Sequence, residues 1–171
     1  GLNLISFILC RPLPPHPPHI PHDHPSRPDP QALRRWGNLL SASRLLMLSS
    51  YCSMWILVAL MPTIFRNLGY VVLGPMLSGV MDITRIFTFI LLWRWHGWHG
   101  RFSPLMICMV VLPAGFFMVL LSDQLPVVLL GEAFFGISAG VLYYSSLYCA
   151  MVVKNASVDA GGSHEGLIGT G

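Results

Sequence analysis

The chain has 171 residues, of which 54% are hydrophobic and only 10% are charged, and its formal net charge is +3. Soluble domains carry about 25% charged residues, so this composition excludes an ordinary soluble protein and indicates an integral membrane protein. The net charge is small and spread among loops, so a nucleic-acid partner is not expected, whereas the lipid bilayer is.

The first 38 residues contain no complete membrane span. Residues 1–9 are apolar but shorter than the roughly 20 residues that cross a bilayer, so we interpret them as the end of a preceding transmembrane helix. Residues 10–38 include the tract RPLPPHPPHIPHDHPSRPDPQ, whose proline density favours an extended linker. Its scattered histidines would lose much entropy in closing one coordination site, so neither a metal nor a cofactor is expected.

Four apolar runs follow within residues 39–171, and each is long enough to cross a bilayer as a helix. They cover about residues 45–64, 70–93, 104–121 and 125–153. The predicted fold class is therefore an all-α membrane protein with four full transmembrane helices. Pro113 and Gly115 predict a kink in the third run. Trp93, Trp95 and Trp98 fit an interfacial aromatic belt near the end of the second.

A further helix is predicted from about residue 163. Ser163 would cap it, and His164 and Glu165 would stand at its start, with Glu165 near the positive end of the helix dipole. The residue three positions after Glu165 is Ile168, so the zinc-protease pattern H-E-x-x-H is not met.

The charged residues between the runs predict how the chain crosses the membrane. Basic residues on one side outnumber those on the other, and the positive-inside rule makes the richer side cytoplasmic. The predicted cytoplasmic residues are Arg34, Arg35, Arg44, Arg94, Arg101 and Lys154, and the turns on the opposite side carry Arg66 and Asp123.

One acidic residue interrupts the last run. Glu132, Gly136 and Gly140 are four residues apart and so share one helical face. Glycines at this spacing let a neighbouring helix approach closely, which predicts that Glu132 points into protein and not toward lipid. A carboxylate in that position is costly and usually functional, so Glu132 is a candidate for proton coupling.

The second run repeats this pattern, because Gly74, Ser78 and Asp82 are also four residues apart. Gly74 and Ser78 are therefore predicted to pack against a neighbouring helix. Arg85 follows Asp82 by one helical turn, so the two can form an ion pair. Two interpretations stay open: a neutral lock between helices, or a pair that takes part in gating or coupling.

In two further pairs of aromatic residues, the two partners lie one helical turn from each other. Tyr51 and Trp55 form one pair, and Tyr144 and Tyr148 form the other. Either pair could line an amphipathic cavity, or could simply pack against lipid and neighbouring helices.

Two segments resemble a known family. Tyr143–Tyr148 (YYSSLY) and residues 162–169 (GSHEGLIG) resemble the tenth helix and the start of the eleventh in a bacterial branch of the major facilitator superfamily. The loop Trp98–Arg101 (WHGR) is similar as well. The superfamily's loop signature, a Gly and an Asp followed by several Arg, is not clear here, since only Gly100–Arg101 lies in the expected loop.

The resemblance implies a partial helical bundle that covers the end of helix six to the start of helix eleven. Residues 10–38 would be the central cytoplasmic linker, and most of the chain would belong to the C-terminal half of a longer transporter. The implied function is secondary active transport of a small solute by alternating access, with proton coupling, in a bacterial inner membrane. The implied partners are the missing N-terminal half and a small-molecule substrate.

Two other functions are compatible with the sequence. One is a membrane-embedded metal enzyme, whose candidate ligands are His96, His99, His164, Glu165 and Asp82. No two of them share a metal-ligand spacing on one helix, so an enzyme is not expected. The other is a structural or sensing membrane protein that keeps the fold without transporting anything.

Overall fold

A computed structural model describes residues 30–95, 97–99, 101–153 and 166. The described part consists of helices joined by turns and short loops, without a strand. The helices are α2 (Pro30–Asn67), α3 (Gly74–Leu77), α4 (Val80–Arg94), α5 (Ser103–Leu121) and α6 (Leu125–Val153).

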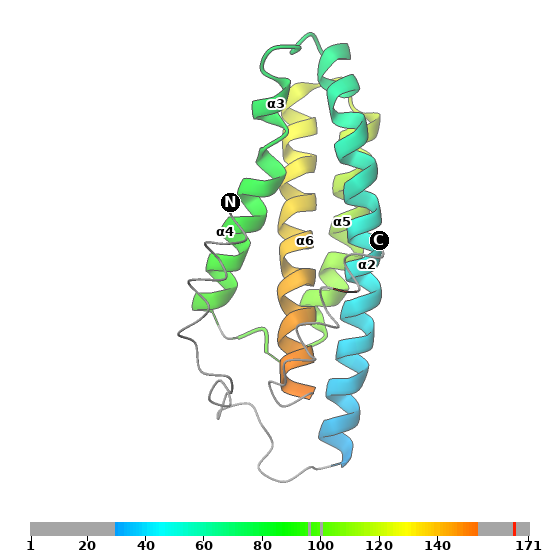
Figure 1. Cartoon of the computed structure of the whole chain (residues 1–171), viewed down its shortest axis with the longest axis vertical. Helices are drawn as coiled ribbons and strands as arrows, with labels where there is room; N and C mark the ends of the chain where they lie inside the picture. Colours follow the sequence, from blue (N-terminus) through cyan, green and yellow to red (C-terminus); the bar gives the residue numbers. More distant parts are fainter. Residues whose placement is uncertain (1–29, 96, 100, 154–165, 167–171) are drawn as a thin grey trace.

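Within the described residues, four segments are long and apolar enough to cross a membrane: Arg34–Asn67, Gly74–Arg94, Ser103–Leu121 and Leu125–Val153. They run alternately in opposite directions (Figure 1). The start of α2, the connection after α4 and the end of α6 therefore lie at one end of the bundle. The turns that follow α2 and α5 lie at the other end. The prediction of an all-helical, multi-pass membrane protein is confirmed at this level.

Helix α6 forms the centre of the bundle. α2, α4 and α5 all pack against it, and α2 and α4 each rest mainly on α6 and not on one another (Figure 1). α5 approaches α6 closely, because a Cβ on Gly131 would lie 2.9 Å from the Gly115 carbonyl oxygen. Gly115, which was expected to contribute to a kink, lies at this close contact, and α5 continues as one helix through Pro113.

The first helix begins earlier than predicted. α2 starts at Pro30, so residues 30–38 of the predicted linker are helical and the helix extends well ahead of the apolar run at 45–64. Proline suits the first turn of a helix, where its missing N–H costs nothing, and Gln31–Arg35 are good helix formers. Residues 1–29 and the helix predicted from residue 163, with His164 and Glu165, lie outside the described residues.

The second span is not one continuous helix, which corrects the prediction for residues 70–93. α3 has only four residues, and a turn at Ser78–Gly79 separates it from α4. The Ser78 hydroxyl donates to the Pro75 carbonyl at 3.0 Å, and Gly79 lowers helix stability at the break. Gly74 and Asp82 therefore belong to different helices, although Gly74, Ser78 and Asp82 all line the groove described below. Gly74 packs against α2, where an added Cβ would lie 3.0 Å from the Phe65 Cβ.

Candidate functional site

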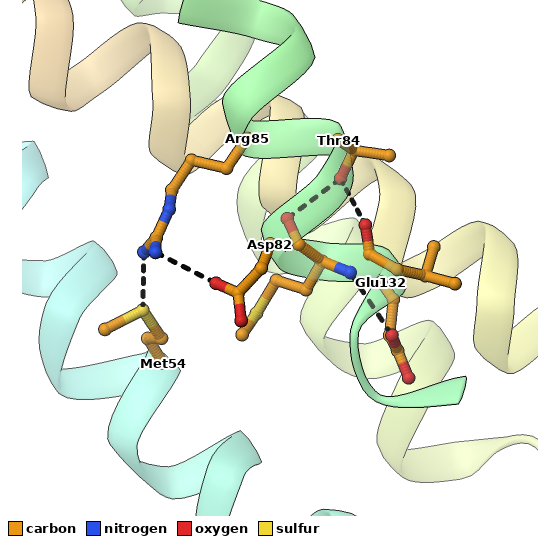
Figure 2. Close-up of polar contacts among 7 residues, drawn as sticks. Met54, Asp82, Thr84, Arg85 and Glu132 are labelled. Carbon is orange, nitrogen blue, oxygen red and sulfur yellow. Dashed lines mark hydrogen bonds and ion pairs between the residues drawn. The ribbon is translucent and has the colours of Figure 1, made fainter. Parts of the chain in front are cut away.

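Glu132 lies in the interior of the bundle, with none of its surface exposed. Its Oε2 accepts a hydrogen bond from the backbone N–H of Met81 at 3.4 Å (Figure 2). Met81 is the second residue of α4, where a backbone N–H has no partner within its own helix. The carboxylate of α6 thus caps α4 from outside, at the end where the helix dipole favours negative charge.

The second carboxylate oxygen of Glu132 has a different environment. Oε1 is buried and has no hydrogen-bond partner within the described residues. A buried polar atom without a partner is costly, so such atoms are usually found where a proton, water or ligand completes the site. Oε1 is therefore the carboxylate oxygen that can take a proton without losing a hydrogen bond.

The glycines next to Glu132 explain how α4 comes so close. The position of a Cβ on Gly136 is already taken by Thr84 Oγ1 and the Met81 carbonyl oxygen. One turn further, a Cβ on Gly140 would lie 3.0 Å from the Thr88 Cβ. The face carrying Glu132, Gly136 and Gly140 therefore packs directly on the backbone of α4.

Asp82 and Arg85 form the ion pair that their spacing predicts. Arg85 Nη2 lies 2.9 Å from Asp82 Oδ1, and Arg85 Nη1 lies 3.3 Å from the sulfur of Met54 on α2. In Figure 2 this group lies on the side of α4 that faces α2, and Glu132 lies on the other side. The Asp82 side chain is 55% exposed, in contrast to the buried Glu132. Because α2 and α4 do not pack against each other, the side of α4 that faces α2 stays exposed.

A groove of about 490 Å³ lies beside this pair, between the end of α2, the following turn, α3 and the start of α4. Most of its lining is apolar, from residues such as Met61, Phe65 and Val71. Its polar lining comes from Arg66, Ser78 and Asp82.

Of the aromatic residues proposed to line a cavity, Tyr51, Tyr144 and Tyr148 are connected through the rings of Tyr143, Phe89 and Trp98, and Trp55 lies apart from them. Tyr51 lies 6.5 Å from Tyr143 of α6, measured between ring centroids, and Phe89 of α4 lies 5.5 Å from the same ring. These three rings lie over α6, between α2 and α4. Trp55 is 58% exposed, and it does not line the groove beside Asp82 and Arg85.

Tyr144 lies 6.2 Å from Phe89, and both Tyr144 and Tyr148 contact the connection after α4. Trp98 packs edge-on against both rings, with centroids 5.6 and 5.0 Å away, and its indole N–H donates to the Leu92 carbonyl at 3.2 Å. His99 stacks on Tyr148 at 4.2 Å. Trp98 is only 4% exposed, so its assignment to an interfacial belt is wrong, whereas Trp93 and Trp95 are exposed.

Several residues of this region were not predicted from the sequence to belong to it: Trp36, whose ring lies 6.2 Å from that of Tyr148, Met54, Arg66, Met81, Phe89 and Tyr143. Met81 contributes a backbone group, which no side-chain pattern reveals. Tyr143 and Phe89 are ordinary apolar residues in apolar runs. Arg66 is visible in the sequence as the basic residue nearest the end of the first span.

Within the described residues, no group of three His, Cys, Asp or Glu side chains is placed to hold a metal ion. His96, His164 and Glu165 lie outside the described part, and His99 contacts Tyr148. Comparisons with protein-family models, with curated proteins and with solved structures find no match for this chain. The geometry around Glu132 and the groove is therefore the basis for a proposed function.

Proposed function

We propose that this chain forms part of a secondary active transporter that moves a small solute by proton-coupled alternating access. The fold is compatible with the C-terminal half of a major facilitator superfamily protein, which residues 143–148 and 162–169 resemble. The observation that carries the proposal is the fully buried carboxylate of Glu132, hydrogen-bonded to the N-terminus of an interrupted membrane helix.

An ionisable group inside a membrane helix is costly and tends to serve ion or proton movement. Transporters commonly use interrupted helices, whose half-helix ends hold charged groups near mid-membrane. Here the hydrogen bond from Met81 to Glu132 involves the group that would carry the proton. A hydrogen bond to an ionised carboxylate is about twice as strong as one between neutral groups, so protonation would loosen α4 from α6.

The Asp82–Arg85 pair would act as a gate in this proposal. Arg85 links α4 to Met54 of α2, across the open side of the bundle. Half-exposed ion pairs contribute little stability individually, so this link can break and re-form during a cycle. The Arg-rich end of the bundle would face the cytoplasm of a bacterial cell, with the Arg66 end opposite.

The test is transport by the intact protein in vesicles. A ligand-stabilisation screen first identifies a solute, and its proton-driven uptake or efflux is then compared between wild type and Glu132→Gln. The amide keeps the size of the side chain and an oxygen that accepts from Met81, but carries no titrating proton. We expect proton-driven transport to be lost while exchange of solute across the membrane remains.

Ser145→Ala is the matched control. Ser145 is buried in the same helix, and its hydroxyl also has no hydrogen-bond partner within the described residues. Its loss should leave proton-driven transport intact. Unchanged proton-driven transport in Glu132→Gln would remove Glu132 from coupling.

A further inference from the structure

We propose that the groove beside Arg66 binds an organic anion with an apolar body. This names the substrate class of the proposed transporter, so as an assignment of substrate it rests on the proposed function. As a binding site it stands on the geometry of the groove alone.

The size and the walls of the groove suit a small organic molecule. Its volume of about 490 Å³ falls within the roughly 300–1,000 Å³ of typical ligand sites. Val58, Met61 and Phe65 from α2 and Val71 from the turn supply an apolar wall. Pro62 and Pro75 also line the groove and restrict its backbone on either side. The apolar body of a ligand would lie against this wall.

The charges around the groove favour an anion. Arg66 lines it, and within the described residues its guanidinium has one weak contact, to the Thr63 hydroxyl at 3.5 Å, and no carboxylate partner. The other charged lining residue, Asp82, is neutralised by Arg85 at 2.9 Å. The three groups together leave one positive charge, on a guanidinium whose planar fork matches a carboxylate or phosphate.

The groove is also connected to the buried acid. Met81 lines the groove, and its backbone N–H is the group that binds Glu132. A ligand against this lining would contact the residue whose position depends on Glu132. Binding in the groove and the state of the carboxylate can therefore influence one another through Met81.

The experiment compares two ligands that share one apolar body, 2-naphthoate and 2-naphthylmethylammonium. Their binding to the intact protein in neutral maltoside detergent is measured by calorimetry. We expect the anion to bind about ten-fold more tightly than the cation, and Arg66→Gln to remove this preference. Arg66→Lys should keep most of it. Equal affinity for the two ligands, or an unchanged preference in Arg66→Gln, would overturn the proposal.

Two further variants locate the effect. Arg94→Gln removes an exposed arginine at the far end of α4 and should leave the preference for the anion unchanged. Asp82→Asn frees the Arg85 charge beside the groove and should tighten binding of naphthoate. Weaker binding of naphthoate in Asp82→Asn would contradict the charge argument. The melting temperature of each variant is measured, so that loss of fold is separated from loss of binding.

The anion could be a water-soluble molecule or a lipid headgroup, and nanodiscs distinguish the two. If the natural occupant is an anionic lipid, phosphatidylglycerol discs will weaken naphthoate binding to wild type but not to Arg66→Gln. If it is soluble, phosphatidylglycerol and phosphatidylcholine discs will give the same affinity. Either result supports the anion site. An affinity for naphthoate that changes neither with the lipid nor with Arg66→Gln would contradict it.

The binding result is independent of transport. Anion preference without any solute flux in vesicles would leave the site standing and defeat the transport proposal. Proton-driven flux without anion preference would do the reverse.

Discussion

Gly136 of α6 lies directly against Met81 of α4, so closely that the place of a Cβ is occupied by the Met81 carbonyl oxygen. This contact holds the backbone of α4 at the distance from which the Met81 N–H reaches Glu132, one turn away on the same face of α6. The small residue and the acid are thus parts of one arrangement.

The first prediction concerns this contact. Gly136→Ala would force the Thr84 side chain and the α4 backbone to move, and overpacking of this kind costs about 1–3 kcal/mol. We expect a lower melting temperature in detergent. Gly37→Ala is the control, because nothing lies within 4 Å of a Cβ there, and alanine in an open helical position should be neutral or stabilising. Equal effects of the two substitutions would contradict the packing argument.

The second prediction separates the structural role of Glu132 from its charge. Glu132→Ala removes the acceptor of the Met81 N–H and leaves that donor buried without a partner, which costs about 1–3 kcal/mol in addition to the cavity. Glu132→Gln retains an acceptor and should be clearly more stable than the alanine variant. Thermal unfolding of both in detergent checks the order, and an alanine variant as stable as the glutamine variant would count against the cap.

The third prediction concerns Trp98. Trp98→Leu loses a buried indole, its hydrogen bond to Leu92 and its contacts with Tyr144 and Tyr148. We expect destabilisation of about 2–4 kcal/mol. Trp93→Leu, at a side chain that is 68% exposed, should have little effect on the same unfolding assay. Similar melting temperatures for the two variants would mean that Trp98 is not buried as described.

The fourth prediction is a small coupling energy between Asp82 and Arg85. A double-mutant cycle with Asp82→Asn and Arg85→Gln should give less than about 1 kcal/mol, because both side chains are partly exposed and adjacent on one helix. The cycle is measured on the free energy of unfolding. A coupling of several kcal/mol would mean that the pair is too stable to break and re-form during a cycle, which would contradict its role as a gate.

The fifth prediction is the direction in which the chain crosses the membrane. After replacement of the native cysteines Cys10, Cys52, Cys108 and Cys149, single cysteines are placed at positions 66 and 101. A membrane-impermeant maleimide should label them from opposite sides, with position 101 on the cytoplasmic side. Labelling of both positions from one side would overturn the alternating arrangement.

The spans after residue 100 could be predicted closely from the sequence. The predicted limits 104–121 and 125–153 differ from α5 and α6 by at most one residue, since the polar turn Ser122–Gln124 separates two uninterrupted apolar runs. The start of α2 was missed because hydropathy marks where a helix is apolar and not where it begins. Arg34 and Arg35 belong to the same α-helix as the apolar residues that follow them.

The candidate site could be predicted only in part. The spacing of Glu132, Gly136 and Gly140 indicates a packed face, and that face lies on α4. The partner of Glu132 is a backbone N–H exposed by a break in another helix, and hydropathy averages over such a break. Gly74-Pro75 and Gly79 were the available signals for it. The burial of Trp98 was not predicted, because composition alone does not distinguish an indole at the lipid interface from one that packs against Tyr144 and Tyr148 of α6.

The break at Ser78–Gly79 divides the second membrane-spanning segment into α3 and α4. Before the break, α3 packs against α2 where Gly74 contacts Phe65. After the break, α4 packs against α6 at Gly136. Arg66 of α2 and Asp82 of α4 line the groove from the two sides of this break, and α2 and α4 both pack on α6. The width of the groove is therefore set by the way in which α2 and α4 each sit on α6.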